Sequence, residues 1–180
     1  MTAINSETNA FLARARLLSL DVDGVMTDGG LYYADDGRQL RKFNVKDGFG
    51  IRRLMAVGVE VAIISAGTMN NIIDRAKTLG ISHVWIGQKS KAETLRTLCR
   101  ELDIDMADAG HMGDDINDLE AMKIAGCAFA VADAVPEVLS AADHTTHRRG
   151  GDGAVREVCD MIVKAKGGPK TAPKAPDDLE

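Results

Sequence analysis

The chain has 180 residues, of which 45% are hydrophobic and 27% charged, and its formal net charge at pH 7 is −5. This composition is that of an ordinary soluble globular domain and excludes a fully disordered chain. Net acidity without a basic block argues against a nucleic-acid partner.

The apolar runs are all far shorter than the roughly 20 residues that cross a bilayer, so we expect no membrane partner. Residues 1–10 show no basic stretch leading into an apolar one, so we expect no secretory signal. The three cysteines, Cys99, Cys127 and Cys159, are odd in number and widely spaced. They are typical of buried thiols in a reducing compartment, and we therefore expect a cytoplasmic protein.

Short apolar runs recur along the chain and predict buried parallel strands at residues 17–20, 59–64, 83–86, 109–112 and 127–131. The segments between and after them place apolar residues at helical spacing, around residues 51–55, 72–76, 95–102, 119–122 and 155–162. Strand and helix alternate, which predicts an α/β fold with a doubly wound, Rossmann-like parallel sheet. We expect one such domain over residues 1–165.

Two regions break the alternation. Residues 30–43 indicate a β-hairpin with its turn at Asp36-Gly37, inserted after the first strand. The insertion is too small for a cap domain. An isolated hairpin is marginal in water, so its apolar face, with Leu31, Tyr33 and Phe43 as candidates, should pack on the domain's own site or on another subunit. Residues 166–180 are rich in Gly, Pro and charge and predict a flexible tail.

Ligands in doubly wound sheets bind beyond the carboxyl ends of the strands. Polar residues follow the predicted strands at these ends: Asp21, Asp23, Ser65, Lys91, Asp114, Asp115 and Asp118. Five converging carboxylates repel one another, so a cation must accompany them, and oxygen ligands favour a hard ion such as Mg2+. A hydroxyl and an ammonium complete a clamp for a phosphoryl group. The set favours phosphoryl transfer, with a carboxylate as nucleophile and a second acid as proton donor.

The same residues in the same order resemble the four motifs of the haloacid dehalogenase superfamily of phosphatases. Together with the Phe-Asn-Val-Lys-Asp-Gly run at residues 43–48, they resemble more narrowly its phosphatases of an eight-carbon sugar-acid phosphate, a lipopolysaccharide precursor. The resemblance covers residues 17–163. It implies that Asp21 is the nucleophile and a Mg2+ ligand and that Asp114 is a second ligand. Asp23 would be the acid/base, contact the substrate and offer its backbone carbonyl to the metal.

The resemblance also implies that Ser65 and Lys91 bind the phosphoryl group and that Asp115 and Asp118 orient metal-bound waters. The family's sugar-acid contacts correspond to Asn44, Val45, Lys46, Asp47, Gly48, Arg52 and Arg75. The family is a homotetramer in which the hairpins assemble into a central β-barrel beside neighbouring active sites. A small-molecule sugar-acid phosphate is therefore the expected partner, and a homotetramer the expected assembly.

One departure bears on the substrate. Close relatives usually carry Thr-Gly-Arg after the second strand, whereas this chain has Ser65-Ala66-Gly67 and so lacks that guanidinium. A phosphatase of a nine-carbon sugar-acid phosphate is the alternative substrate reading. A non-catalytic assembly domain of the same fold is the alternative function.

Receiver domains are a competing class of protein, because they also place an acid pair, a Ser or Thr and a Lys on a doubly wound sheet. A receiver domain needs an acid at the end of the third strand, where residues 83–88 offer none.

Some of the candidate site residues also have plainer interpretations. Lys89 competes with Lys91 for the phosphoryl group, and Asp115 could be simply an exposed acid. His83 and His111 flank predicted strands and are expected to be packed rather than catalytic.

Overall fold

A sheet of six parallel strands forms the centre of the protein in a computed structural model that describes residues 5–168. Its strands are β1 (Leu17–Leu20), β4 (Glu60–Ile64), β5 (His83–Trp85), β6 (Ala109–Gly113), β7 (Cys127–Ala130) and β8 (His144–Thr145). They lie in the order β5-β4-β1-β6-β7-β8, and each adjacent pair is parallel. The predicted doubly wound α/β sheet is confirmed, with β1 at its centre.

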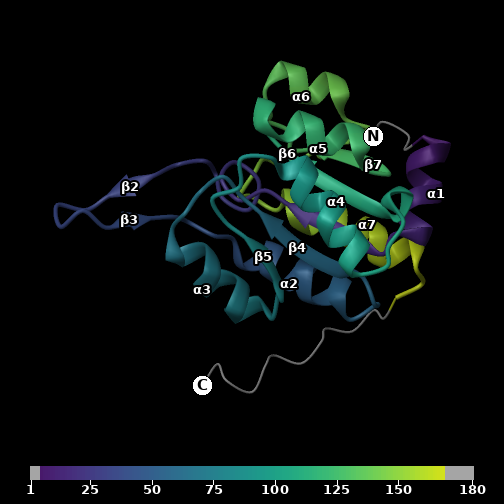
Figure 1. The fold of residues 1–180 in the computed structure, drawn as a ribbon, viewed down its shortest axis with the longest axis horizontal. Coiled ribbons are helices and arrows are strands. Elements are labelled where there is room, and N and C mark those ends of the chain that lie inside the picture. Colours follow the sequence, from purple (N-terminus) through teal and green to yellow (C-terminus); the bar gives the residue numbers. More distant parts are fainter. Residues whose placement is uncertain (1–4, 169–180) are drawn as a thin grey trace.

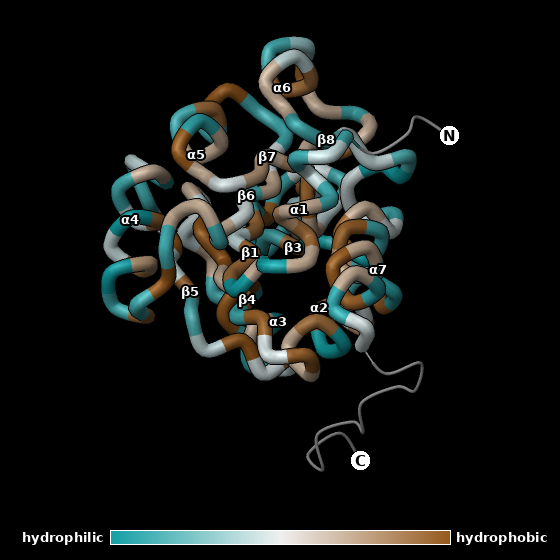
Figure 2. Tube along the Cα trace, turned by 90° about the vertical axis from the view of Figure 1, so that its right-hand side faces the viewer, coloured by the Kyte–Doolittle hydropathy of each residue, from teal (hydrophilic) through white to brown (hydrophobic). Residues whose placement is uncertain are grey.

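Helices cover both faces of this sheet (Figure 2). One face packs against α1 (Ser6–Arg14), α2 (Val45–Met55), α3 (Asn70–Leu79) and α7 (Ala154–Ala165). The other packs against α4 (Lys91–Glu101) and α5 (Leu119–Ile124). The helix α6 (Pro136–Ala141) lies beside α5 and β7, and two short 3-10 turns are η1 (Met106–Asp108) and η2 (Ile116–Asp118).

The strands are apolar on both sides because helices cover both faces. Leu18 and Leu20 of β1 belong to the core beneath α2 and α7, whereas Leu17 belongs to the core beneath α4. In the same way Val61 and Ile63 of β4 face one core, and Ala62 and Ile64 face the other. Continuous apolar runs in the sequence are the expected signature of such strands.

The predicted hairpin is present between β1 and α2, with strands β2 (Tyr32–Tyr33) and β3 (Gln39–Leu40). Gly37 takes a φ of +83° in its turn, a conformation that favours glycine. Figure 1 shows the hairpin projecting away from the rest of the domain. Phe43 differs from expectation, because it is half-buried beneath the Arg75 guanidinium and forms a bridge with Thr27. The exposed apolar face of the hairpin therefore excludes Phe43.

The helices α1 and α6 and the turns η1 and η2 were not predicted, and no apolar run marks β8, which is indicated only by Thr145 and Thr146. α1 contributes few large apolar residues, although Phe11 is fully buried with its ring 5.9 Å from that of Phe129. α6 and β8 have six and two residues, too few for a periodic pattern. Of the predicted tail, only residues 166–168 lie within the described part. No helix in residues 5–168 is both long and apolar enough to span a membrane.

Candidate active site

The carboxyl ends of β1, β4 and β6 open into one cavity of about 140 Å³. Its lining residues are Asp21, Asp23, Ser65, Ala66, Gly67, Asp114, Asp115 and Asn117. The topology thus brings together groups that lie far apart in the sequence. Of the polar side chains that line the cavity, that of Asn117 was not predicted. Nothing in its motif separates it from an ordinary exposed amide.

Lys91 does not line the cavity itself but contacts one of its acids, Asp21, and the buried Asp118, whereas its neighbour Lys89 is exposed. The Lys91 ammonium is 2.9 Å from Asp21 Oδ2 and 2.6 Å from Asp118 Oδ1, and its side chain is 2% exposed. Burial acts to lower the pKa of Lys91, but the charges of the two carboxylates outweigh it and raise that pKa. One buried cation therefore links the start of α4 to β1 and η2.

Asp118 is fully buried and is held from several sides. Its Oδ1 lies 3.0 Å from His111 Nε2, and His111 Nδ1 lies 2.8 Å from the Ser19 hydroxyl. Its Oδ2 accepts the backbone N–H of Asp114 at 3.1 Å. Burial acts to raise the pKa of Asp118, but the His111 hydrogen bond and the Lys91 charge lower it to about 2. His111 is packed, as expected, and it also fixes the carboxylate that holds Lys91.

The buried acids fit a hard divalent cation. Carboxylate oxygens of Asp21, Asp114 and Asp118 lie within 4.8 Å of one another, and Asp114 Oδ1 is buried without a hydrogen-bond partner. Burial raises the pKa of Asp21 to about 6 and, together with the neighbouring carboxylates, that of Asp114 to about 7. Lys91 alone does not neutralise three carboxylates. Both Asp118 oxygens already accept hydrogen bonds and Asp21 Oδ2 contacts Lys91, whereas Asp114 Oδ1 has no partner, so Asp114 is the carboxylate of the three that is most open to a metal.

The chain turns sharply after β1, where Gly24 adopts a φ of +87°. A Cβ atom at Gly24 would lie 1.9 Å from Asp114 Oδ2. Only glycine therefore allows the loop that carries Asp21 and Asp23 to approach Asp114 so closely.

Asp23 lies on the rim of the cavity and is bound by an arginine that the sequence did not single out. Arg41 Nε is 2.6 Å from Asp23 Oδ1, and Arg41 Nη2 is 3.0 Å from Oδ2. Arg38 and Lys42 are equally plausible cations of the same hairpin, so no spacing signal marks Arg41.

Ser65 and Asp115 occupy different depths of the same cavity. Ser65 is buried, and its Oγ accepts the backbone N–H of Gly67 at 3.0 Å, which leaves the hydroxyl proton free to donate. Asp115 is exposed, and its carboxylate accepts the N–H of Ile116 and caps η2. Asp115 therefore has a local structural role at the rim.

The predicted sugar-acid contacts lie apart from the acids. Four of them line a second cavity of about 170 Å³: Val45, Gly48, Arg52 and Arg75. Asn44 accepts the backbone N–H of Lys46 at the start of α2, and Lys46 itself is exposed. Asp47 is buried, and its carboxylate accepts backbone N–H groups at the start of α7. Within one chain, these residues do not join the acidic cavity.

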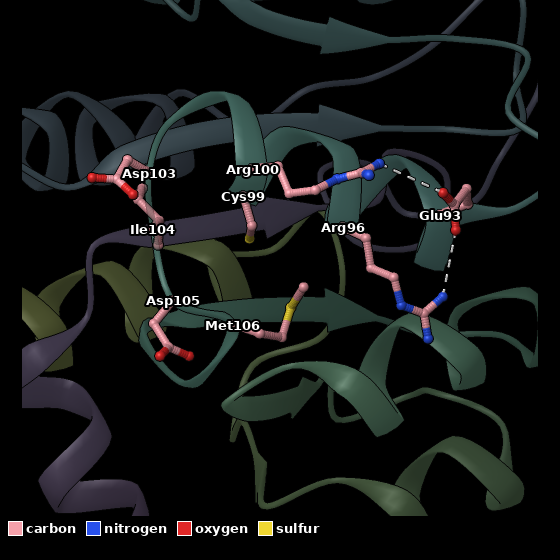
Figure 3. Close-up of a pocket in the computed structure, with 8 residues that line it drawn as sticks. All are labelled: Glu93, Arg96, Cys99, Arg100, Asp103, Ile104, Asp105 and Met106. Carbon is pink, nitrogen blue, oxygen red and sulfur yellow. Dashed lines mark ion pairs between the residues drawn. The ribbon is translucent and has the colours of Figure 1, made fainter.

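A larger cavity, of about 630 Å³, lies beside α4 and the segment that follows it. Figure 3 shows Arg96 and Arg100 both directed toward Glu93, with ion pairs of 3.6 and 3.8 Å. This cavity holds none of the predicted site residues.

Comparisons with known proteins give consistent similarities. The haloacid dehalogenase-like hydrolase family matches residues 78–158. The 3-deoxy-D-manno-octulosonate 8-phosphate phosphatase of Salmonella typhi is 45% identical over 152 residues, 84% of this chain and 81% of the relative.

Solved structures agree. That of the Yersinia pestis phosphatase of the same name has a TM-score of 0.90 at 41% identity and covers 93% of this chain and 90% of that one. That of the Moraxella catarrhalis phosphatase, in complex with magnesium, phosphate and KDO, has a TM-score of 0.87 at 36% identity and covers 89% and 92%.

The first prediction concerns Lys91. In metal-free protein, Lys91→Met should lower the free energy of unfolding by about 3 kcal/mol, because it leaves Asp21 and Asp118 buried without their cation. Urea denaturation measures this, with Lys89→Met as the control expected to change stability by less than about 0.5 kcal/mol. Equal effects of the two variants would contradict a central role for Lys91.

The second prediction concerns pH. The folded-state pKa values of Asp21 and Asp114, about 6 and 7, exceed the usual 3.8, so the folded metal-free protein retains protons that the unfolded chain has lost. Stability should therefore fall as pH rises from about 4 to about 7. Because a divalent cation binds the ionised carboxylates, Mg2+ should raise the melting temperature more at about pH 8 than at about pH 5. Thermal unfolding with and without Mg2+ measures this, and Asp114→Asn should reduce the difference. A pH-independent Mg2+ effect would contradict the assignment.

Proposed function

Because the chain belongs to the 3-deoxy-D-manno-octulosonate 8-phosphate phosphatases, within the haloacid dehalogenase-like hydrolases, we propose that it releases phosphate from that sugar-acid phosphate. The observation that carries the proposal is the meeting of Asp21, Asp114 and Lys91 at one end of the sheet, beside Asp23 and Ser65. These groups supply a nucleophile, a proton donor and donors for phosphoryl oxygens.

In the first half of the reaction, the Asp21 carboxylate forms a bond to phosphorus while the bond from phosphorus to the sugar oxygen breaks. Asp23 gives a proton to that leaving oxygen, so the sugar acid departs as an alcohol. The Lys91 ammonium and the Ser65 hydroxyl donate hydrogen bonds to the phosphoryl oxygens. Asp21 then carries the phosphoryl group as an acyl phosphate.

In the second half, Asp23 has become a carboxylate and takes a proton from water. The water oxygen bonds to phosphorus, the bond from phosphorus to Asp21 breaks, and inorganic phosphate leaves. Mg2+, when bound by Asp21, Asp114 and the Asp23 carbonyl, supplies positive charge that offsets the charge of the phosphoryl oxygens. Asp115 and Asp118 lie next to these ligands and would orient the waters that the metal binds.

The hairpin supports a proposal about assembly. It exposes Leu31, Tyr32, Tyr33 and Leu40, with exposed fractions of 43%, 54%, 72% and 53%. Apolar side chains gathered on a projecting two-stranded hairpin favour burial against other copies, and we propose a homotetramer. Cys99, Cys127 and Cys159 are buried free thiols, which is consistent with a cytoplasmic enzyme.

The proposed activity is tested by phosphate release from purified sugar-acid phosphates. Release should require Mg2+, stop on chelation and resume when Mg2+ is restored. Asp21→Asn should abolish it because an amide is a far weaker nucleophile, while circular dichroism shows an unchanged fold. A higher kcat/KM for a nine-carbon 9-phosphate would favour the alternative substrate. No phosphate release from any phosphomonoester would favour a non-catalytic assembly domain.

The proposed assembly is tested by deleting residues 32–39. Sedimentation should give smaller particles for the deletion variant than for the native protein, because the deletion removes Tyr32 and Tyr33 and the strand pairing that presents Leu31 and Leu40 beside them. The kcat/KM should fall strongly for the sugar-acid phosphate and less for an aryl phosphate, since a neighbouring surface no longer closes the site. A native protein that is monomeric at micromolar concentration would overturn the proposal.

A further inference from the structure

Arg41 follows β3 at the base of the hairpin, and its guanidinium reaches the rim of the acidic cavity. It binds both oxygens of Asp23, at 2.6 and 3.0 Å. The Arg41 side chain is only 3% exposed, whereas that of Asp23 is 34% exposed. The Asp23 hydrogen bond is the main reason that the pKa of Arg41 is raised. The guanidinium is therefore the buried, charged partner in this pair, and the carboxylate keeps an open side.

The guanidinium is itself fixed by two further elements. Arg41 Nη1 donates to Asn71 Oδ1 at 3.1 Å and to Gln39 Oε1 at 3.4 Å. Asn71 Nδ2 in turn donates to the Gln39 carbonyl oxygen at 3.2 Å. All three guanidinium nitrogens thus have partners. The base of the hairpin, the first turn of α3 and Asp23 form one connected network.

We propose that Arg41 is the positioning residue for Asp23, an inference that rests on the proposed function. A carboxylate offers about four acceptor sites, two on each oxygen. The fork of Arg41 uses a site on each oxygen, which fixes the plane of the carboxylate and leaves an outer site to carry the transferable proton. A general acid must lie within hydrogen-bond reach of its leaving oxygen, so this orientation sets how well Asp23 delivers the proton.

The role predicts a dependence on the leaving group. The value of kcat/KM reports the steps up to departure of the leaving group, and a sugar alkoxide needs a proton from Asp23 whereas a nitrophenolate does not. Arg41→Gln should lower kcat/KM for the sugar-acid phosphate about 10- to 100-fold. For para-nitrophenyl phosphate the loss should stay below about threefold, since leaving-group protonation contributes little there.

Two milder variants keep the test valid if Arg41→Gln folds poorly. Arg41→Lys retains the charge without the fork, so it should give a smaller loss that is still confined to the sugar-acid phosphate. Asn71→Ala removes one support of the guanidinium and should shift the ratio of the two kcat/KM values in the same direction. Lys42→Gln is the matched control, because exposed Lys42 pairs with Asp28 and leaves the network intact.

Equal losses on both substrates would overturn the proposal, since a purely structural role affects every leaving group alike. Wild-type values on both substrates for Arg41→Gln would overturn it as well. Failure of the proposed function is distinguishable from failure of the Arg41 role, because the wild-type enzyme would then release phosphate from neither substrate in the presence of Mg2+. That result would overturn the Arg41 role as well.

Discussion

The buried contact of Lys91 with Asp21 and Asp118 is the interaction on which the rest of the site depends. Three carboxylates whose oxygens lie within 4.8 Å of one another would repel strongly in a low-dielectric interior. The Lys91 ammonium reduces that repulsion. His111 and Lys91 both contact Asp118 Oδ1, so the charged form of Asp118 is stabilised by two partners. The remaining negative charge falls on Asp21 and Asp114, where burial has raised the pKa of both carboxyls. Metal binding and the proposed catalysis therefore both depend on the negative charge of Asp21 and Asp114 that Lys91 does not neutralise.

The topology of the sheet brings these charged residues together at one edge. Because all six strands are parallel, the loops after β1, β4 and β6 meet at one edge, and Gly24 lets the first of them approach Asp114 closely. The hairpin inserted after β1 adds Arg41 to that edge. The hairpin thus carries exposed apolar residues along its two strands and a buried cation, Arg41, at its base. The proposed assembly and the proposed proton transfer both involve this one segment.

The sequence predicted the parts of this structure that rest on repeated patterns. Apolar runs located five of the six strands, and the order of polar residues at the strand ends predicted the acidic cavity around Asp21 and Asp114. α1 and α6 were missed because they are short or carry few apolar residues, and β8 is too short to form an apolar run. Arg41 and His111 act through tertiary contacts that no spacing in the chain specifies. The predicted sugar-acid contacts stay a prediction, since Asp47 caps α7 and Arg52 and Arg75 line a separate cavity.

The central claim is that Asp21 becomes the covalent carrier of the phosphoryl group. Acid quenching of the Mg2+-bound enzyme during turnover, followed by borohydride reduction and peptide mass spectrometry, tests this directly, because reduction converts an aspartyl phosphate to homoserine. We expect homoserine at position 21 in the native enzyme and an unmodified peptide in Asp21→Asn. A phosphoryl group on Ser65, or reduction at Asp114 in place of Asp21, would contradict it.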